Sequence, residues 1–318
     1  MLSLHTPRTV QKTGDDRPVK TLRAFIWRMT GGAQAVAIVL ALCVTILGLA
    51  PLELQRRLVD DAIGGSDKDL LILLGAIYAG VMILHKLLKF ALSMFQSWLG
   101  EGTILYLRNH IRGLDTREKN DEGENAAVSI LTTEVEKLGG FVGTGPSQLM
   151  ANGSILIGTL TYMMIVEPLV AGLGLLFLLP QIALAPLMQG KLNQLVERRL
   201  TLMRSYGSDI ASENGDNEGQ DLERGLHDNR MTFFFWKFLL KGILNLLNTA
   251  TPLAVLLIGG FMVLAGETTL GVIIAFVTGF ARLGDPIRSL IAFYREAAQA
   301  NVHHRMVADW VTAHLDKR

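Results

Sequence analysis

The chain has 318 residues, of which 50% are hydrophobic and only 19% are charged, and its formal net charge is +1. Mean hydropathy is +0.34. Such a composition excludes an ordinary soluble domain of this size and favours a protein of the lipid bilayer. Because Cys43 is the single cysteine of the chain, an intrachain disulfide is excluded as well.

The N-terminal segment is polar and lacks the apolar stretch that opens a cleaved signal peptide. We therefore expect residues 1–18 to form a cytoplasmic arm, and the first membrane span to act as an uncleaved signal. Basic and apolar residues mix along Val19–Trp27. This pattern predicts an amphipathic helix that lies on the inner surface of the membrane.

Six segments are apolar enough to cross the hydrocarbon core, for which about 20 residues are needed. They are Ala33–Leu52, Leu70–Leu84, Ser147–Val166, Pro168–Leu187, Gly242–Ala265 and Leu270–Ala281. The second is interrupted near its far side by His85, Lys86 and Lys89, whose long cationic side chains can reach the headgroups. The sixth is the weakest by hydropathy, since its purely apolar part ends at Ala281.

Lysine and arginine are distributed very unevenly between the connections. They gather in the N-terminal arm, in residues 100–146 and 189–241 and after residue 281, whereas the loops at Glu167 and at 266–270 have none. This asymmetry predicts that both termini are cytoplasmic. We expect a multi-pass protein of the plasma membrane, in a bacterium the inner membrane. The two internal connections each exceed forty residues and carry helical periodicity, so we expect helices that project well into the cytoplasm.

Short motifs stand at the ends of the predicted spans. Pro51 and Leu58–Ala62 close the first span, Leu107 and Arg108 follow the second, and Glu134 and Val135 precede the third. The longest motif begins with Gly266, Thr269, Leu270 and Gly271, continues with Ile274, Ala275 and Phe276, and is followed by Pro286 and Arg305. In their order and spacing, over about residues 21–311, these motifs resemble the type-1 transmembrane domain of ABC exporters.

The resemblance implies an all-α membrane protein in which residues 19–311 form six transmembrane helices with long cytoplasmic extensions and 312–318 form a C-terminal tail. It also implies a transmembrane (permease) subunit that works with a second copy or a homologue around a central cavity. Mg-ATP would bind to a separate or missing nucleotide-binding domain, with no cofactor in this chain. The implied partners are membrane lipid, that ATPase and the second transmembrane subunit, but no nucleic acid.

Two short segments superficially resemble a nucleotide site and a metal site. Gly190 and Lys191 superficially match a phosphate-binding loop, but Leu192 stands where Ser or Thr would hold magnesium. We therefore expect no enzymatic activity in this chain. The adjacent His303 and His304 would point in different directions on a helix, so we interpret them as solvent-exposed residues and not as metal ligands.

Polar residues at membrane depth are candidates for lining the cavity. Arg282, Asp285 and Arg288 follow one another at a spacing of three on the sixth helix, and Asn245 and Asn248 lie on the fifth. Ionisable groups at this depth usually face a bundle interior or a water-filled space. Our hypothesis is that the two arginines attract anionic substrates, and the alternative is that Arg282 and Asp285 simply pair along the helix.

Two candidate segments for coupling to an ATPase lie in the internal loops. They are Leu114, Asp115, Thr116 and Arg117, and Glu213, Asn214, Gly215 and Asp216. The second segment lies within residues 212–229, a stretch rich in Gly, Asn and Asp, which predicts poor helix formation there. Two functions therefore stay open: an exporter permease, and a non-transporting membrane scaffold or sensor with a degenerate exporter fold. A third, an ion-coupled carrier, would be expected to show internal repeats, and we find no clear one.

Overall fold

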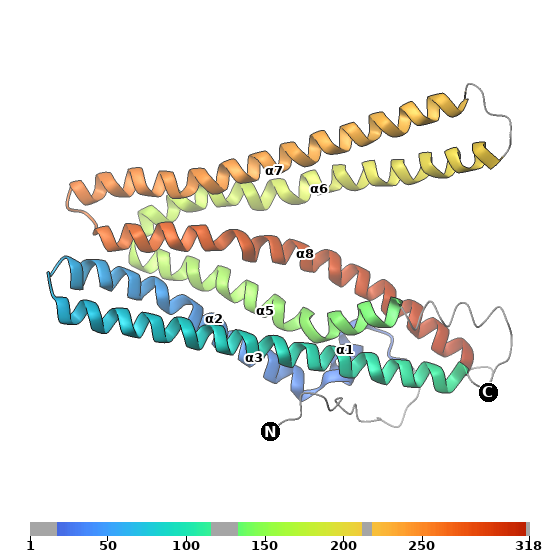
Figure 1. Ribbon diagram of the computed structural model, residues 1–318, viewed down its shortest axis with the longest axis horizontal. Helices are drawn as coiled ribbons and strands as arrows, with labels where there is room; N and C mark the ends of the chain where they lie inside the picture. Colours follow the sequence, from blue (N-terminus) through green and yellow to red (C-terminus); the bar gives the residue numbers. More distant parts are fainter. Residues whose placement is uncertain (1–17, 116–132, 212–217, 316–318) are drawn as a thin grey trace. The chain divides into compact units, whose positions relative to one another are not determined.

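A computed structural model describes residues 18–115, 133–211 and 218–315, and the elements in these ranges are helices (Figure 1). A short helix precedes a long one that ends in a π-helical segment, and five further long helices follow. These elements are α1 (Leu22–Thr30), α2 (Gly32–Arg57), η1 (Leu58–Ile63), α3 (Lys68–Asp115), α5 (Val135–Val166), α6 (Pro168–Ala211), α7 (Glu218–Leu264) and α8 (Leu270–Leu315).

Six helical stretches in the described part of the chain are long and apolar enough to cross a membrane. They begin with α2 and η1 taken together and continue with α3, α5, α6, α7 and α8. The predicted all-α fold with six spans is thereby confirmed, and the sixth span, which was the weakest by hydropathy, belongs to a helix of 46 residues.

The long helices exceed what a bilayer requires. With 48 residues, α3 is about 72 Å long at a rise of about 1.5 Å per residue. The bilayer with its headgroups measures only about 40–45 Å. Since α6, α7 and α8 have 44, 47 and 46 residues, each must extend beyond a membrane surface, as the helical periodicity of the internal connections predicted.

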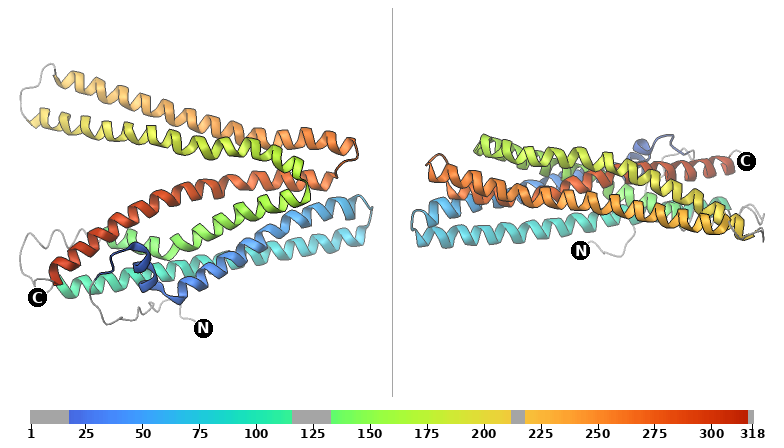
Figure 2. Two further views of the ribbon diagram at one scale, coloured as in Figure 1. Left: turned by 180° about the vertical axis from the view of Figure 1, so that it is seen from behind. Right: turned by 90° about the horizontal axis from the view of Figure 1, so that it is seen from above.

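The predicted poor helix formation over 212–229 is wrong from Glu218 onward, because α7 begins there. Helices α6 and α7 run side by side in every view (Figures 1 and 2). The Asn229 side-chain amide donates a hydrogen bond of 2.9 Å to the Leu195 carbonyl, and the Tyr206 hydroxyl donates one of 2.6 Å to Glu223. Packing against α6 thus outweighs the low helix propensity of the sequence.

The chain divides into two compact units, each described by itself. The first unit lies within Met1–Thr161 and Asp285–Arg318 and the second within Tyr162–Gly284. The second unit therefore holds α6, α7 and the first part of α8. In it, Phe280 lies directly against Gly174 and Ile273 directly against Gly259, while Phe276 is fully buried. The apolar start of α8 is packed by these contacts against both α6 and α7.

In the first unit, α3 and α5 cross with their backbones in contact. A Cβ atom added to Gly143 would lie 2.4 Å from the Gln96 carbonyl oxygen and 2.7 Å from the Gly100 nitrogen. The buried Gln96 amide donates a hydrogen bond of 2.7 Å to the Ser147 hydroxyl beside this crossing. Only glycine permits so close an approach of two helices.

The residues that begin α8 explain the longest sequence motif. Gly266 has φ +75°, a backbone conformation that glycine adopts without strain. The Thr269 hydroxyl accepts a hydrogen bond of 3.4 Å from the Val272 backbone N–H and so caps α8. The glycine and the threonine of this motif therefore build the turn between α7 and α8.

Candidate functional site

The charged residues predicted to line a cavity lie on α8. Asp285 accepts a hydrogen bond of 2.5 Å from Arg288, and the two side chains are 85% and 62% exposed. The alternative that Arg282 pairs with Asp285 is therefore wrong, because the partner of Asp285 is Arg288. An acidic residue on the N-terminal side of a basic one is the better arrangement in a helix, which favours Arg288. Arg282 is exposed.

The two candidate asparagines lie on α7, three residues apart. Asn245 is exposed and Asn248 is half-buried. The Asn245 backbone carbonyl accepts a hydrogen bond of 3.0 Å from the Thr249 hydroxyl. The role of these asparagines and of the α8 charges in lining a pathway stays a prediction.

The candidate coupling segments fall mostly beyond what the structure describes. Leu114 and Asp115 form the last residues of α3, and their side chains lie outside the described set. Thr116 and Arg117 lie outside the described residues altogether, as does the second segment, formed by Glu213, Asn214, Gly215 and Asp216. Their coupling role also stays a prediction.

A core that the sequence analysis did not identify forms where α3 and α8 end and α5 begins. There α1 meets all three of these helices. We call this core the elbow cluster, and its buried members are Phe25, Met29, Ile104, Leu107, Ile111, Val135, Leu138, Val142, Val307 and Val311. It joins residues nearly three hundred positions apart in sequence, so no local pattern could have revealed it.

Two adjacent histidines of α8 attach it to this cluster. His303 contacts the Glu134 carboxylate, and the two side chains are only 14% and 13% exposed. His304 is buried, and its ring lies 5.0 Å from that of Phe25 on α1. The predicted solvent exposure of both histidines is therefore wrong. Neighbouring residues on a helix point about 100° apart, and here each direction meets a different helix.

No group of three or more metal-ligating side chains occurs among the residues that the structure describes. The contact with His303 explains the position of Glu134, the first residue of the short motif that precedes the third span. Val135, the second residue of that motif, is fully buried in the elbow cluster.

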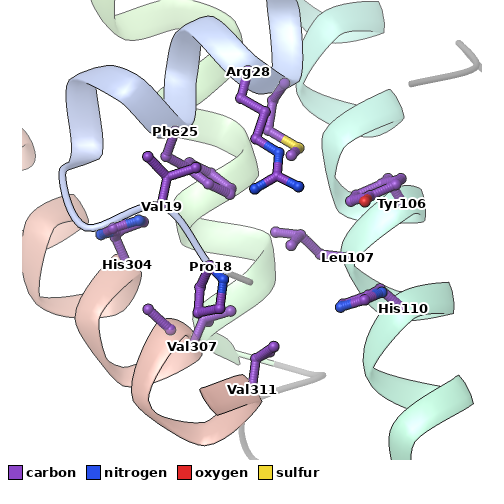
Figure 3. Close-up of a pocket in the computed structure, with 12 residues that line it drawn as sticks. Pro18, Val19, Phe25, Arg28, Tyr106, Leu107, His110, His304, Val307 and Val311 are labelled. Carbon is purple, nitrogen blue, oxygen red and sulfur yellow. The ribbon is translucent and has the colours of Figure 1, made fainter. Parts of the chain in front are cut away.

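A half-open pocket of about 40 Å³ lies against the elbow cluster (Figure 3). Three helices and the segment that precedes α1 supply its lining. Its walls are mainly apolar, and its polar members are Arg28 of α1, Tyr106 and His110 of α3, and His304 of α8. The amphipathic pattern of Val19–Trp27 indicated one of these elements, but the sequence carried no signal for the others.

The chain matches a protein family model and is similar to a known bacterial protein. The family model described as "ABC transporter transmembrane region" matches residues 35–206, which is more than half of the chain. The chain is also similar to the "Putative multidrug export ATP-binding/permease protein YgaD" of Bacillus subtilis (strain 168), with 25% identity over 275 residues. That alignment covers 75% of this chain and 45% of the relative, so the chain spans less than half of the relative's length. No nucleotide-binding domain family matches the chain.

Proposed function

This chain belongs to the ABC transporter transmembrane family, and we propose on that basis that it is the permease subunit of an ABC exporter. Two such domains, either two copies or this chain and a homologue, would enclose the substrate pathway. ATP hydrolysis on a nucleotide-binding domain that is not in this sequence would switch the pathway between inward and outward openings.

The observation that carries the proposal is the excess length of the helices. Helices α3, α6, α7 and α8 each have 44 to 48 residues, which is about 20–30 Å more than a bilayer with its headgroups requires. Extensions of this length need a partner outside the membrane, and a cytoplasmic ATPase would supply one. The relative's printed name, which joins ATP-binding and permease functions, supports the same assignment.

The charges of α8 suggest which substrates would be favoured. Asp285 offsets the charge of Arg288, with which it pairs, whereas Arg282 keeps its charge on an exposed stretch of the same helix. Under the proposal, Arg282 makes the cavity attractive to anionic or amphipathic anionic substrates. Replacing Arg282 by glutamine would then reduce export of an anionic dye more than that of a cationic dye.

The experiment begins with affinity capture of the native complex, followed by reconstitution of the chain in liposomes with and without the captured ATPase subunit. We expect ATP hydrolysis and dye export only with both proteins present, and neither when the phosphate-binding lysine of the ATPase is replaced. Hydrolysis by this chain alone would refute the proposal. A captured complex that neither hydrolyses ATP nor moves any dye would favour the scaffold or sensor function instead.

A further inference from the structure

The pocket beside the elbow cluster combines an apolar wall with hydrogen-bond donors. Figure 3 shows the Arg28 guanidinium reaching into the space between His304 on one side and Tyr106 and His110 on the other. The wall consists of Phe25, Met29, Leu107, Val307 and Val311, together with Pro18, Val19 and Ala308. No carboxylate is among the lining residues of this pocket.

His304 is the least satisfied group in the pocket. Its side chain is only 2% exposed, and neither ring nitrogen has a hydrogen-bond partner among the residues that the structure describes. The Val19 backbone makes a polar contact with the ring that falls short of a full hydrogen bond. A buried polar group without a partner is costly, and such groups in folded proteins usually contact a water molecule or a ligand.

The polar groups around His304 determine which charge a ligand in the pocket would carry. Arg28 carries a permanent positive charge and five N–H donors. The Tyr106 hydroxyl can donate, and the His110 ring stacks on that of Tyr106 with centroids 6.0 Å apart. Arg28 and His110 also interact with other groups of the protein, but a guanidinium has enough donors to serve these groups and an anion together.

We propose that this pocket binds a phosphate group, with Arg28 and His304 as the main donors. A volume of about 40 Å³ corresponds to roughly three water molecules by the usual measure of about 10–15 Å³ each. That is the scale of a phosphate and is too small for a whole lipid, so the acyl chains of a bound lipid would lie outside the pocket.

The position of α1 places membrane phosphate within reach. Together α2 and η1 have 32 residues and measure about 48 Å, close to the thickness of a bilayer with headgroups. Helix α1 joins the start of α2 at Gly31, so it lies at headgroup level, where the 62% exposure of Trp27 is typical of an interfacial residue. The phosphate of an anionic phospholipid is therefore one source of the ligand, and free phosphate is the other.

The test uses the full chain purified in a neutral detergent. Native mass spectrometry measures retention of phosphatidylglycerol against phosphatidylcholine, and thermal unfolding is followed with and without added inorganic phosphate. The test variants are His304→Phe, which keeps an aromatic ring against Phe25, and Arg28→Gln. The matched control is Arg23→Gln, because Arg23 lies on the exposed side of the same helix and does not line the pocket.

We expect the wild type and the Arg23→Gln variant to retain phosphatidylglycerol preferentially. Each test variant should lose about tenfold or more in affinity, the usual effect of removing a hydrogen bond to a charged group. If inorganic phosphate alone raises the unfolding temperature of the wild type, and not that of Arg28→Gln, the pocket takes free phosphate.

Three results would overturn the proposal. The first is equal retention of the two lipids by the wild type with no effect of phosphate. The second is a loss of binding that is as large in the Arg23→Gln variant as in the Arg28→Gln variant. The third is wild-type binding by His304→Phe, or by His304→Leu should the phenylalanine variant not fold, because neither side chain can donate a hydrogen bond. None of these measurements depends on transport, so the proposed exporter function is tested separately.

Discussion

Replacing Gly143 by alanine tests whether direct backbone contact holds α3 and α5 together. The new methyl group would lie 2.4 Å from the Gln96 carbonyl oxygen, 2.7 Å from the Gly100 nitrogen and 2.9 Å from the Gly100 Cα. All three are backbone atoms, so no side chain can rotate away to make room. The two helices must separate at this point for the variant to fold.

The expected cost combines three effects. Inserting a methyl group into a closely packed contact costs about 1–3 kcal/mol. Separation of the helices also weakens the buried hydrogen bond from Gln96 to Ser147, and such bonds in membrane proteins contribute about 0.6 kcal/mol. Alanine gains about 0.5–1 kcal/mol over glycine within a helix. The variant should therefore be less stable than wild type by about 1–3 kcal/mol.

The assay is unfolding in mixed micelles by titration with sodium dodecyl sulfate, followed by circular dichroism. Gly140 provides the matched control, since it lies on the exposed side of the same helix with nothing within 4 Å of an added Cβ. Alanine at Gly140 should leave stability unchanged or raise it by up to about 1 kcal/mol. If the Gly143 variant proves as stable as the Gly140 variant, the helices do not meet in the way described.

Three further results are expected. The variants Glu134→Gln and His303→Gln should each lose about 1–3 kcal/mol of stability. A double-mutant cycle should show a coupling energy of at least about 0.5 kcal/mol between the two residues. Additive losses would mean that the contact contributes nothing to stability. Alanine at Gly266 should cost about 1–2 kcal/mol because of its positive φ, whereas alanine at Gly242, a helical position with open space, should not destabilise. In intact cells with a cysteine-free background, a cysteine at Glu267 should react with an impermeant maleimide, whereas one at the C-terminus should react only after lysis; the reverse pattern would invert the predicted topology.

The membrane spans could be predicted because each depends on a local property of the chain. A continuous apolar run of sufficient length has few alternatives to a transmembrane helix, because every backbone group must be paired inside the bilayer. Even the sixth span, whose purely apolar part ends at Ala281, was placed correctly. The motif from Gly266 to Thr269 was likewise informative, since both its glycine and its threonine act within a few residues of their own positions.

The elbow cluster could not be predicted for the opposite reason. His303 and Glu134 are separated by 169 positions, and nothing near either residue indicates the other. The reasoning that adjacent histidines point apart was correct, but it assumed solvent on both sides where the fold places α1 and α5. In the same way, the low helix propensity after Glu218 predicted poor helix formation. The packing against α6 that stabilises the helix there cannot be recognised from the local sequence.

The two histidines also suggest how the candidate coupling segment is connected to the proposed substrate pathway. The first candidate coupling segment, at Leu114–Arg117, begins with the last two residues of α3, and α5 begins after the same internal loop. Through Glu134 and His303, the start of α5 contacts α8, the helix that also carries Arg282. A displacement of the candidate coupling segment that moved α5 would therefore act on the helix that carries the proposed substrate charge, Arg282. His304 and Phe25 would link α1 to the same movement. A change of cavity shape needs such a continuous physical connection, and the elbow cluster supplies one between α1, α3, α5 and α8.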